Sequence, residues 1–317
     1  MTLIKNKLYR ISNKQFSGEL FLIITTVIWG GTFVVVKESL HDISTMLFIA
    51  LRFIIALLIL FPFLFNKKKQ FHKEAIVGGF LLGLLFFIGF ATQTIGLKFT
   101  TATKSAFITG SSVILVPILQ TLIERKPPTK GALIGTVLVF IGILFLSSGG
   151  NSIFSFISDL GGNFNIGDFF TLLCAIFFAA YVVYLDVVSS KFGFWVTLTM
   201  QMLTTAVLGL LAAVIFDLTN IETLHIEVTD YLIFGLIYTA LFATLITTAI
   251  LTKYQKVVTP TKAAIIYSLE PIFASVLAFF LLNEKITNFG FVGAVLIISG
   301  LVASEFYEAF VNGRKFS

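Results

Sequence analysis

The chain has 317 residues, of which 57% are hydrophobic and 12% are charged, and its mean hydropathy is +1.00. A soluble domain carries about 25% charged residues and does not expose the apolar area that this chain would leave in water. The composition therefore excludes a soluble enzyme, a disordered protein and, despite the net charge of +6, a nucleic-acid-binding protein. We expect an integral membrane protein.

Apolar stretches long enough to cross a bilayer recur ten times along the chain. A transmembrane helix needs about 20 residues to cross a hydrocarbon core of roughly 30 Å. Strands of a membrane barrel would alternate in polarity, and the apolar run at 54–65 does not alternate. The predicted fold is therefore all-α, with ten transmembrane helices. The expected spans cover residues 18–36, 43–65, 75–96, 102–123, 130–148, 166–186, 193–216, 229–251, 260–282 and 288–306.

Lys and Arg residues are distributed unequally between the two sides of this ten-span topology. Of the 22 basic residues, 16 lie in the two tails and in the loops on the same side, such as 66–74, whereas three lie in loops on the opposite side. Loops that stay in the cytoplasm are enriched in Lys and Arg. We therefore predict a multi-pass protein of the cell inner membrane, embedded in the lipid bilayer with both termini in the cytoplasm.

The chain also contains an internal repeat. A shift of 158 positions aligns its two halves, and the matches that carry most weight are Thr101 with Thr259, Thr103 with Thr261, Lys104 with Lys262, Gly135 with Gly293 and Gly142 with Gly300. In addition, Gly18-Glu19 opens the first span as Gly167-Asp168 opens the sixth. Because each repeat holds five spans, an odd number, the two repeats must cross the membrane in opposite senses.

Inverted repeats of this kind are characteristic of secondary transporters, which bind their substrate near the middle of the membrane. We predict a first repeat at 18–148, a second repeat at 166–306 and an extracytoplasmic linker at 149–165.

The segment GLKFTTATKSAF at 96–107 resembles the junction between the third and fourth helices of the EamA-type branch of the drug/metabolite transporter (DMT) superfamily. Further matches are Trp29-Gly30, VILVP at 113–117, LEP at 269–271 and NEK at 283–285. The resemblance extends over nearly the whole chain. It implies ten helices in two inverted five-helix EamA repeats, a central cavity, and export of amino acids, other metabolites or drugs.

These observations predict a secondary transporter, an exporter that moves small organic metabolites such as amino acids or drugs across the inner membrane by alternating access. The alternative is a non-transporting membrane scaffold or sensor, which we would expect to carry an exposed docking domain. A channel would need a ring of charges or a carbonyl filter, and the sequence shows neither. Proton coupling of transport and the oligomeric state are left open.

No catalytic or cofactor-binding motif competes with this interpretation. The three histidines form no HExxH pair, and the chain has no Gly-rich phosphate loop and no G-x-S-x-G elbow. Cys174 is the single cysteine, which excludes a thiolate metal site. We therefore predict no enzyme activity, no metal and no cofactor.

Glu270 and Arg52 lie about ten and nine residues inside their predicted spans. A charged side chain at such a depth costs about 2.5–3.5 kcal/mol on insertion scales and marks a functional position by default. Glu270 either lines a cavity, carries protons or makes a structural contact. Arg52 either forms a structural or gating ion pair, with Glu270 or with carbonyls at a helix end, or contacts substrate, or extends to the membrane interface.

Two prolines and two lysines complete the set of special positions. Pro117 and Pro271 are predicted to kink their helices, because proline has no N–H to donate. Lys104 and Lys262 occupy the first turns of the fourth and ninth spans, where a cation opposes the helix dipole. Because both repeats carry this lysine, we expect either a paired gating contact across the bundle or anchoring at the membrane interface.

The remaining candidates for a substrate pathway are polar or aromatic residues inside the spans. Together with Glu270, the predicted substrate-binding residues are Trp29, Thr32, Gln93, Thr109, Ser112, Tyr181, Tyr184, Tyr238 and Tyr267. A cavity with few charges and several rings would suit amino-acid or aromatic substrates.

Overall fold

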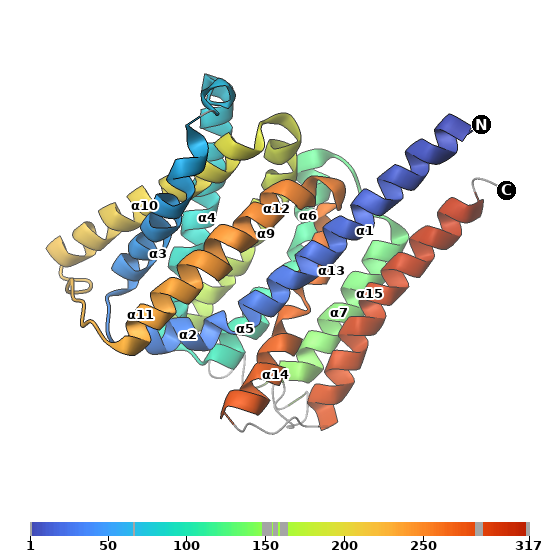
Figure 1. The fold of residues 1–317 in the computed structure, drawn as a ribbon. Helices are drawn as coiled ribbons and strands as arrows, with labels where there is room; N and C mark the ends of the chain where they lie inside the picture. Colours follow the sequence, from blue (N-terminus) through green and yellow to red (C-terminus); the bar gives the residue numbers. More distant parts are fainter. Residues whose placement is uncertain are drawn as a thin grey trace.

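The computed structural model describes residues 2–65, 67–147, 154, 158, 164–282 and 288–314, and nearly all of them are helical (Figure 1). These residues form no β-strand, and an isolated bridge joins Ile43 to Ile226. The all-α prediction therefore agrees with the described part of the chain. The predicted linker at 149–165 lies mostly outside the described residues, as does the NEK motif at 283–285.

The helices fall into two sets of similar order. The first set is α1 (Thr2–Gly30), α2 (Thr32–Ser39), α3 (Thr45–Leu60), α4 (Lys73–Phe99), α5 (Ala102–Gly110), α6 (Ser112–Glu124) and α7 (Lys130–Ser147). The second set is α9 (Ile166–Lys191), α10 (Phe194–Leu218), α11 (Asp230–Ile237), the π-helix η3 (Tyr238–Ile246), α12 (Thr247–Tyr254), α13 (Pro260–Tyr267), α14 (Glu270–Leu282) and α15 (Asn288–Arg314). Short 3-10 helices are η1 (Phe61–Leu64), η2 (Lys68–Gln70) and η4 (Gln255–Val257).

The predicted spans can be compared with these helices one by one. Within the described residues, seven segments are long and apolar enough to cross a membrane, and they coincide with predicted spans one to four and six to eight. The fifth and tenth spans coincide with shorter apolar helices at Lys130–Leu146 and Asn288–Ser304, and the ninth is divided between α13 and α14. The structure thus has the character of a multi-pass membrane protein, and the total of ten crossings stays a prediction.

The fourth and ninth predicted spans are each interrupted at the same position of the repeat. The helical path breaks between α5 and α6 at Ser111, and between α13 and α14 at Ser268 and Leu269. The shift of 158 positions carries the start of α5 and both ends of α6 onto those of α13 and α14. In Figure 1, α5 leads upward to α6 whereas α13 leads downward to α14, so the matched helices run in opposite directions.

The prolines explain only one of these interruptions. Pro271 lies in the first turn of α14, where its missing N–H costs little. Pro117 lies inside α6, which continues through it as one helix, so the interruption of this span lies at Ser111 and the kink at Pro117 stays a prediction. The Gly110-Ser111 sequence supplies that break instead, because small and hydroxylated residues hold a helix weakly.

Glycines allow α7 and α15 to pack at close range. A Cβ atom built on Gly135 would lie 2.8 Å from the Gly300 carbonyl oxygen, and one built on Gly142 would lie 2.8 Å from the Gly293 carbonyl oxygen. These four glycines are the two pairs that the repeat aligns, so the two helices meet through equivalent surfaces. Small residues at such an interface let van der Waals packing hold membrane helices together.

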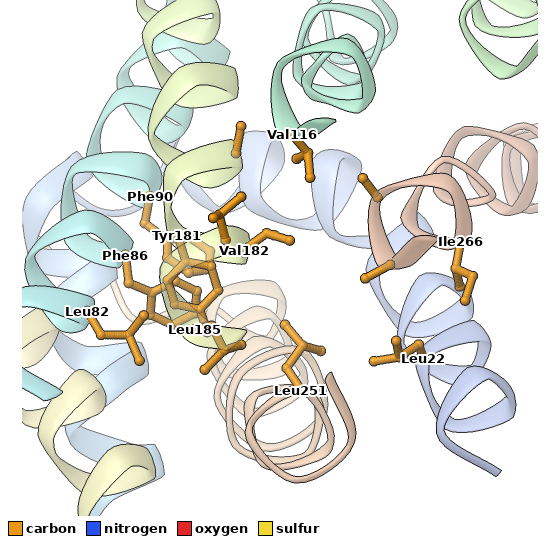
Figure 2. Close-up of a cluster of buried hydrophobic side chains, with 14 of the residues drawn as sticks. Leu22, Leu82, Phe86, Phe90, Val116, Tyr181, Val182, Leu185, Leu251 and Ile266 are labelled. Carbon is orange, nitrogen blue, oxygen red and sulfur yellow. The ribbon is translucent and has the colours of Figure 1, made fainter. Parts of the chain in front are cut away.

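An aromatic cluster joins α4 to α9 in the buried core (Figure 2). The Phe86 ring stacks on the Tyr181 ring at 4.4 Å between centroids, and Phe90 meets Phe86 edge-on at 4.7 Å. Such ring pairs stabilise a contact beyond the area that they bury. The cluster therefore fixes one wall of the space between the two sets of helices.

Candidate substrate cavity

A cavity of about 100 Å³ lies between the two sets of helices. A single water molecule needs only about 10–15 Å³ by a comparable measure, so the cavity has room for several waters or a small organic group. The first set of helices contributes α1, α2, α3, α4, α5 and α6 to its walls, and the second set contributes α9, α12, α13 and α14.

Eight of the ten predicted substrate-binding residues line this cavity. They are Trp29, Thr32, Gln93, Thr109, Ser112, Tyr181, Tyr267 and Glu270, and Arg52 and Pro271 line it as well. The structure brings the eight substrate-binding candidates together from eight helices. Their contact with a substrate stays a prediction.

Tyr184 and Tyr238 lie elsewhere. Tyr184 is one turn beyond Tyr181 on α9 and lines a separate surface hollow with Lys73 and Lys191. Tyr238 lies outside the lining of the cavity, and its hydroxyl donates a hydrogen bond to the Ile28 carbonyl. Both positions were predicted from polarity within a span, which does not specify the face of the helix that points inward.

Side chains compensate for the break between α1 and α2 at Gly31. The Tyr238 hydroxyl donates a hydrogen bond to the Ile28 carbonyl, and the Thr32 hydroxyl donates one to the Trp29 carbonyl at 2.8 Å. Away from water, a carbonyl without a donor is costly. Tyr238 and Thr32 therefore stabilise a non-helical turn at the cavity wall.

Arg52 holds the π-helical segment η3 against α3. Its Nη2 donates to the Ala243 carbonyl at 3.0 Å, and its Nε donates to the Thr244 hydroxyl. The indole N–H of Trp29 donates to the same Ala243 carbonyl at 3.3 Å. A π-helical turn is wider than an α-helical one and often marks a functional site. Here it presents a carbonyl to two side chains from the first set of helices.

The ion pair considered between Arg52 and Glu270 is absent among the described residues. Arg52 instead donates to one backbone carbonyl, that of Ala243, which lies inside η3 and not at a helix end as predicted, and it lies 4.6 Å above the Phe90 ring centroid. With 4% of its surface exposed, Arg52 does not extend to the membrane interface. The two residues lie on different helices, and each has its own surroundings.

Glu270 is partly buried as the first residue of α14, at the edge of the cavity. None of the described residues donates a hydrogen bond to its carboxylate or forms an ion pair with it. The start of a helix favours a negative charge, because the N–H groups of the first turn point toward it. The carboxylate is thus held at the cavity without being neutralised by a neighbouring cation of the described chain.

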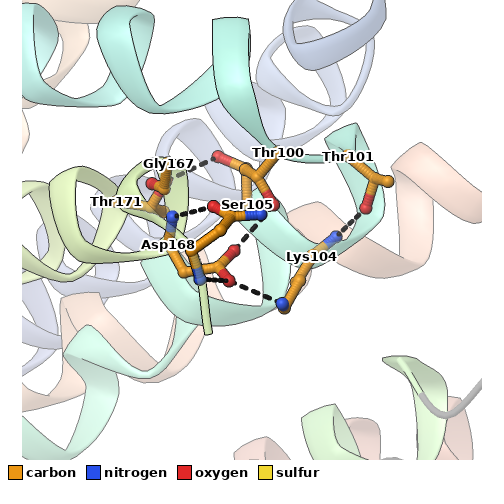
Figure 3. A network of polar contacts seen from close by, with 8 residues as sticks. Thr100, Thr101, Lys104, Ser105, Gly167, Asp168 and Thr171 are labelled. Atoms are coloured by element: carbon orange, nitrogen blue, oxygen red, sulfur yellow. Dashed lines mark hydrogen bonds and ion pairs between the residues drawn. The ribbon is translucent and has the colours of Figure 1, made fainter. Parts of the chain in front are cut away.

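Lys104 and Lys262 pair with carboxylates from the opposite set of helices. The Lys104 ammonium lies 2.5 Å from Asp168, as Figure 3 shows, and the Lys262 ammonium lies 2.6 Å from Glu19. Because Lys262 is only 1% exposed, interfacial anchoring does not describe it. Both acidic residues follow the glycines that open spans one and six, but their positions in the sequence do not by themselves indicate that they pair with these lysines.

A network of glutamines, also missed from the sequence, holds two of the cavity tyrosines. The Tyr181 hydroxyl donates to Gln201 at 2.8 Å, and the Gln201 amide donates to Thr252 at 2.9 Å. The Tyr267 hydroxyl donates to Gln255 at 2.9 Å. These bonds connect α9, α10, α12 and α13 through η4, so the rings are oriented by their buried hydroxyl groups.

The structure is an apolar helical bundle built from two related halves, and polar and aromatic side chains from both halves surround an internal cavity. This is the architecture of a multi-pass membrane transporter. The comparisons with known proteins agree with this class. The chain belongs to the EamA-like transporter family, which it matches over residues 16–148 and 165–304. The two matched segments carry the two-repeat architecture of that family.

Several curated relatives are similar to nearly the whole chain. An uncharacterized transporter from Archaeoglobus fulgidus is 32% identical over 294 residues, which cover 91% of this chain and 86% of that protein. The uncharacterized transporter YyaM from Bacillus subtilis is 25% identical over 299 residues, covering 92% of this chain and 94% of that protein. A solved crystal structure has a similar fold, with a TM-score of 0.74, 14% identity, and coverage of 94% of this chain and 99% of that one.

Proposed function

We propose that this protein is a secondary transporter that exports small organic metabolites, such as amino acids or drugs, across the inner membrane by alternating access. It acts as a carrier and not as an enzyme. The observation that supports this proposal best is the cavity that both repeats line with polar and aromatic side chains. Midplane binding between two inverted repeats is the arrangement from which alternating access follows.

The cavity suits a substrate with an amino group. Glu270 offers a carboxylate that no described residue neutralises, and the rings of Trp29 and Tyr267, 5.5 Å apart between centroids, line the same cavity. An ammonium group is attracted both to a carboxylate and to aromatic faces. Gln93, Thr109 and Ser112 add hydrogen-bonding groups for the rest of an amino acid.

The membrane topology that accompanies this function has ten crossings in two inverted five-helix repeats. Both termini lie at the same end of the bundle in Figure 1, as an even number of crossings requires. The excess of Lys and Arg in the tails and in loops on their side supports a cytoplasmic location for that end.

Transport by the purified protein in liposomes tests the proposal. Vesicles would be screened for saturable uptake of pooled labelled amino acids and organic amines, with and without a pH gradient. We expect saturable uptake that is lost in Glu270→Gln, and stimulation by the gradient would identify proton coupling. No saturable uptake of any pool by a stably folded protein would favour the scaffold or sensor alternative.

Substrate protection locates the binding site. Gln93→Cys would be introduced together with Cys174→Ala, and its reaction with a permeant thiol reagent would be followed. We expect the substrate identified in the uptake screen to slow this reaction, because it would occupy the cavity that Gln93 lines. Equal labelling rates with and without saturating substrate would place binding elsewhere.

A further inference from the structure

The two lysine ion pairs are equivalent contacts of the two repeats, and in each at least one of the two charged side chains is almost fully buried. Lys104 of α5 belongs to the first repeat and reaches Asp168 of α9 in the second, whereas Lys262 of α13 belongs to the second repeat and reaches Glu19 of α1 in the first. Each lysine stands in the first turn of its helix, after a threonine cap that accepts from the lysine N–H. Each acid follows the glycine that opens the first span of the other repeat.

The two pairs lie at opposite ends of the bundle. We call Lys104–Asp168 the distal pair, because α5 begins at the end away from the chain termini, and Lys262–Glu19 the terminal pair, because α13 begins toward them (Figure 1). Opposite placement follows from the opposite directions of the matched helices. Each end of the bundle thus has a lysine–acid pair in an equivalent position, and at the distal end Lys98 of the first repeat also pairs with Glu222 of the second at 2.7 Å.

A second pair of contacts obeys the same symmetry. The Glu222 carboxylate accepts a hydrogen bond from the Thr45 N–H at 2.9 Å, so a loop of the second repeat caps α3 of the first. The Gln70 side chain accepts from the Trp195 N–H at 3.1 Å, so a loop of the first repeat caps α10 of the second. Each end of the bundle therefore has both kinds of inter-repeat contact, a lysine–acid pair and a side-chain cap, in equivalent positions.

The ion pairs bear directly on the cavity. The lysine-bearing helices α5 and α13 also line the cavity, through Thr109 and Tyr267. α5 ends at the break at Ser111, and α13 ends at the break at Ser268 and Leu269. Each ion pair therefore holds a cavity-lining half-helix against the opposite repeat. Asp168 is fully buried and also accepts a hydrogen bond from the Thr100 hydroxyl at 2.7 Å, so this carboxylate is shielded from solvent in the closed arrangement (Figure 3).

We propose that the distal and terminal pairs are the two latches of the transport cycle, and this inference rests on the proposed function. The distal pair separates when the cavity opens away from the termini, and the terminal pair separates when it opens toward them. Both pairs are closed in this structure. Alternating access then requires that one pair stay closed while the other opens, so each latch determines access at its own end.

Sided accessibility of a cavity cysteine tests the latches. Gln93→Cys with Cys174→Ala would be reacted with an impermeant thiol reagent, added from the distal side in intact cells and from the terminal side in inside-out vesicles. Asp168→Asn is expected to raise labelling from the distal side roughly fivefold or more, a normal size for conformational coupling, and Glu19→Gln is expected to raise labelling from the terminal side. Glu74→Gln, which removes an exposed carboxylate paired with His72 within one repeat, is the control.

The test depends on the two variants raising labelling from opposite sides of the membrane. Labelling that rises from the same side in both variants, or that stays unchanged in folded protein, would overturn the proposal. Lys104→Gln and Lys262→Gln are the second variants if an acid variant does not fold, because they leave the Asn165–Asp168 capping box and the helix caps in place. If the variants show the expected side-specific labelling but the uptake screen finds no transported substrate, the proposed function is contradicted. The assignment of the two ion pairs as the contacts that close each end would still be supported.

Discussion

The guanidinium group of Arg52 and the backbone carbonyl of Ala243 form a hydrogen bond of 3.0 Å that joins α3 of the first repeat to the π-helix η3 of the second. Trp29 donates to the same carbonyl, so a wall residue of the cavity and a buried cation share one acceptor. Because this carbonyl fixes both donors, we expect substitutions of Arg52 to lower the stability of the protein. We do not expect them to act by removing a charge partner of Glu270.

Arg52→Lys is expected to lower the free energy of unfolding by about 1–3 kcal/mol, because a compact ammonium lacks the planar fork with which the guanidinium group reaches Ala243 and Thr244 together, and a buried hydrogen bond is lost. Thermal unfolding of the detergent-purified protein measures the loss. Arg125→Lys, at an exposed position after α6, is the matched control and should leave the melting temperature unchanged. Equal melting temperatures for the two variants would contradict the structural role of Arg52.

Glu270→Gln should separate function from stability. Since no described residue pairs with the Glu270 carboxylate, we expect the melting temperature to stay within the range of ordinary surface changes, about 0.5 kcal/mol, while uptake falls. The double variant Arg52→Gln/Glu270→Gln should be no more stable than Arg52→Gln alone. A partial rescue of stability in the double variant would show that the two charges are coupled after all.

The positions of the membrane helices could be predicted from composition, because a bilayer imposes one length and one polarity on every crossing. The span expected at 75–96 lies within α4, and the span expected at 166–186 lies within α9. The interruption at Ser111 could not be predicted in the same way. The average hydropathy of the span stays high across Gly110-Ser111. A local loss of helical hydrogen bonds therefore leaves no signal in the composition of the span.

The partners of the buried charges were the least predictable feature. Helical periodicity assigns a face to Lys104, but it does not specify which of the other helices that face meets. Asp168 lies 64 positions further along the chain, and only the packed structure brings it within 2.5 Å of Lys104. The internal repeat contained the necessary signal, because the lysine and the acid each recur at equivalent positions of the two repeats. Two residues of opposite charge that recur together in this way predict a contact between them.

Gly142→Ala is expected to destabilise the protein by about 1–3 kcal/mol, the usual cost of an overpacked contact. The new Cβ would meet backbone atoms of Gly293 and Ile297 at 2.8 Å, and backbone cannot turn aside as a side chain can. Gly110→Ala is the control, since its nearest neighbour at 3.4 Å is a side-chain methyl group of Ile143. Unfolding by heat should distinguish the two, and equal stability would mean that α7 and α15 separate easily.

The proposed topology predicts which side of the membrane each loop occupies. In a Cys174→Ala background, Lys68→Cys should react with an impermeant thiol reagent only after the cells are opened. Ile221→Cys, in the loop before α11 and 65% exposed, should react in intact cells. Ready labelling of Lys68→Cys from outside would reverse the orientation, although it would leave the fold and the cavity unchanged.

Tyr181 and Tyr184 offer the sharpest test of the cavity, because they lie one turn apart on α9 and only the first lines it. Tyr181→Phe keeps the ring that stacks on Phe86 but removes the hydroxyl that donates to Gln201. Losing this bond should cost about 0.5–1.5 kcal/mol in stability, and the freed network should raise the KM for transport by a factor of about 2–10.

Tyr184→Phe removes the same atom one turn away and should change neither the melting temperature nor the KM. Uptake kinetics and thermal unfolding of the two variants, measured side by side, give the comparison. A KM that rises equally in both would mean that substrate passes along the outer face of α9. A KM that changes in neither, with stability lost in Tyr181→Phe alone, would assign the Tyr181–Gln201 bond to folding and leave the substrate to the residues around Glu270.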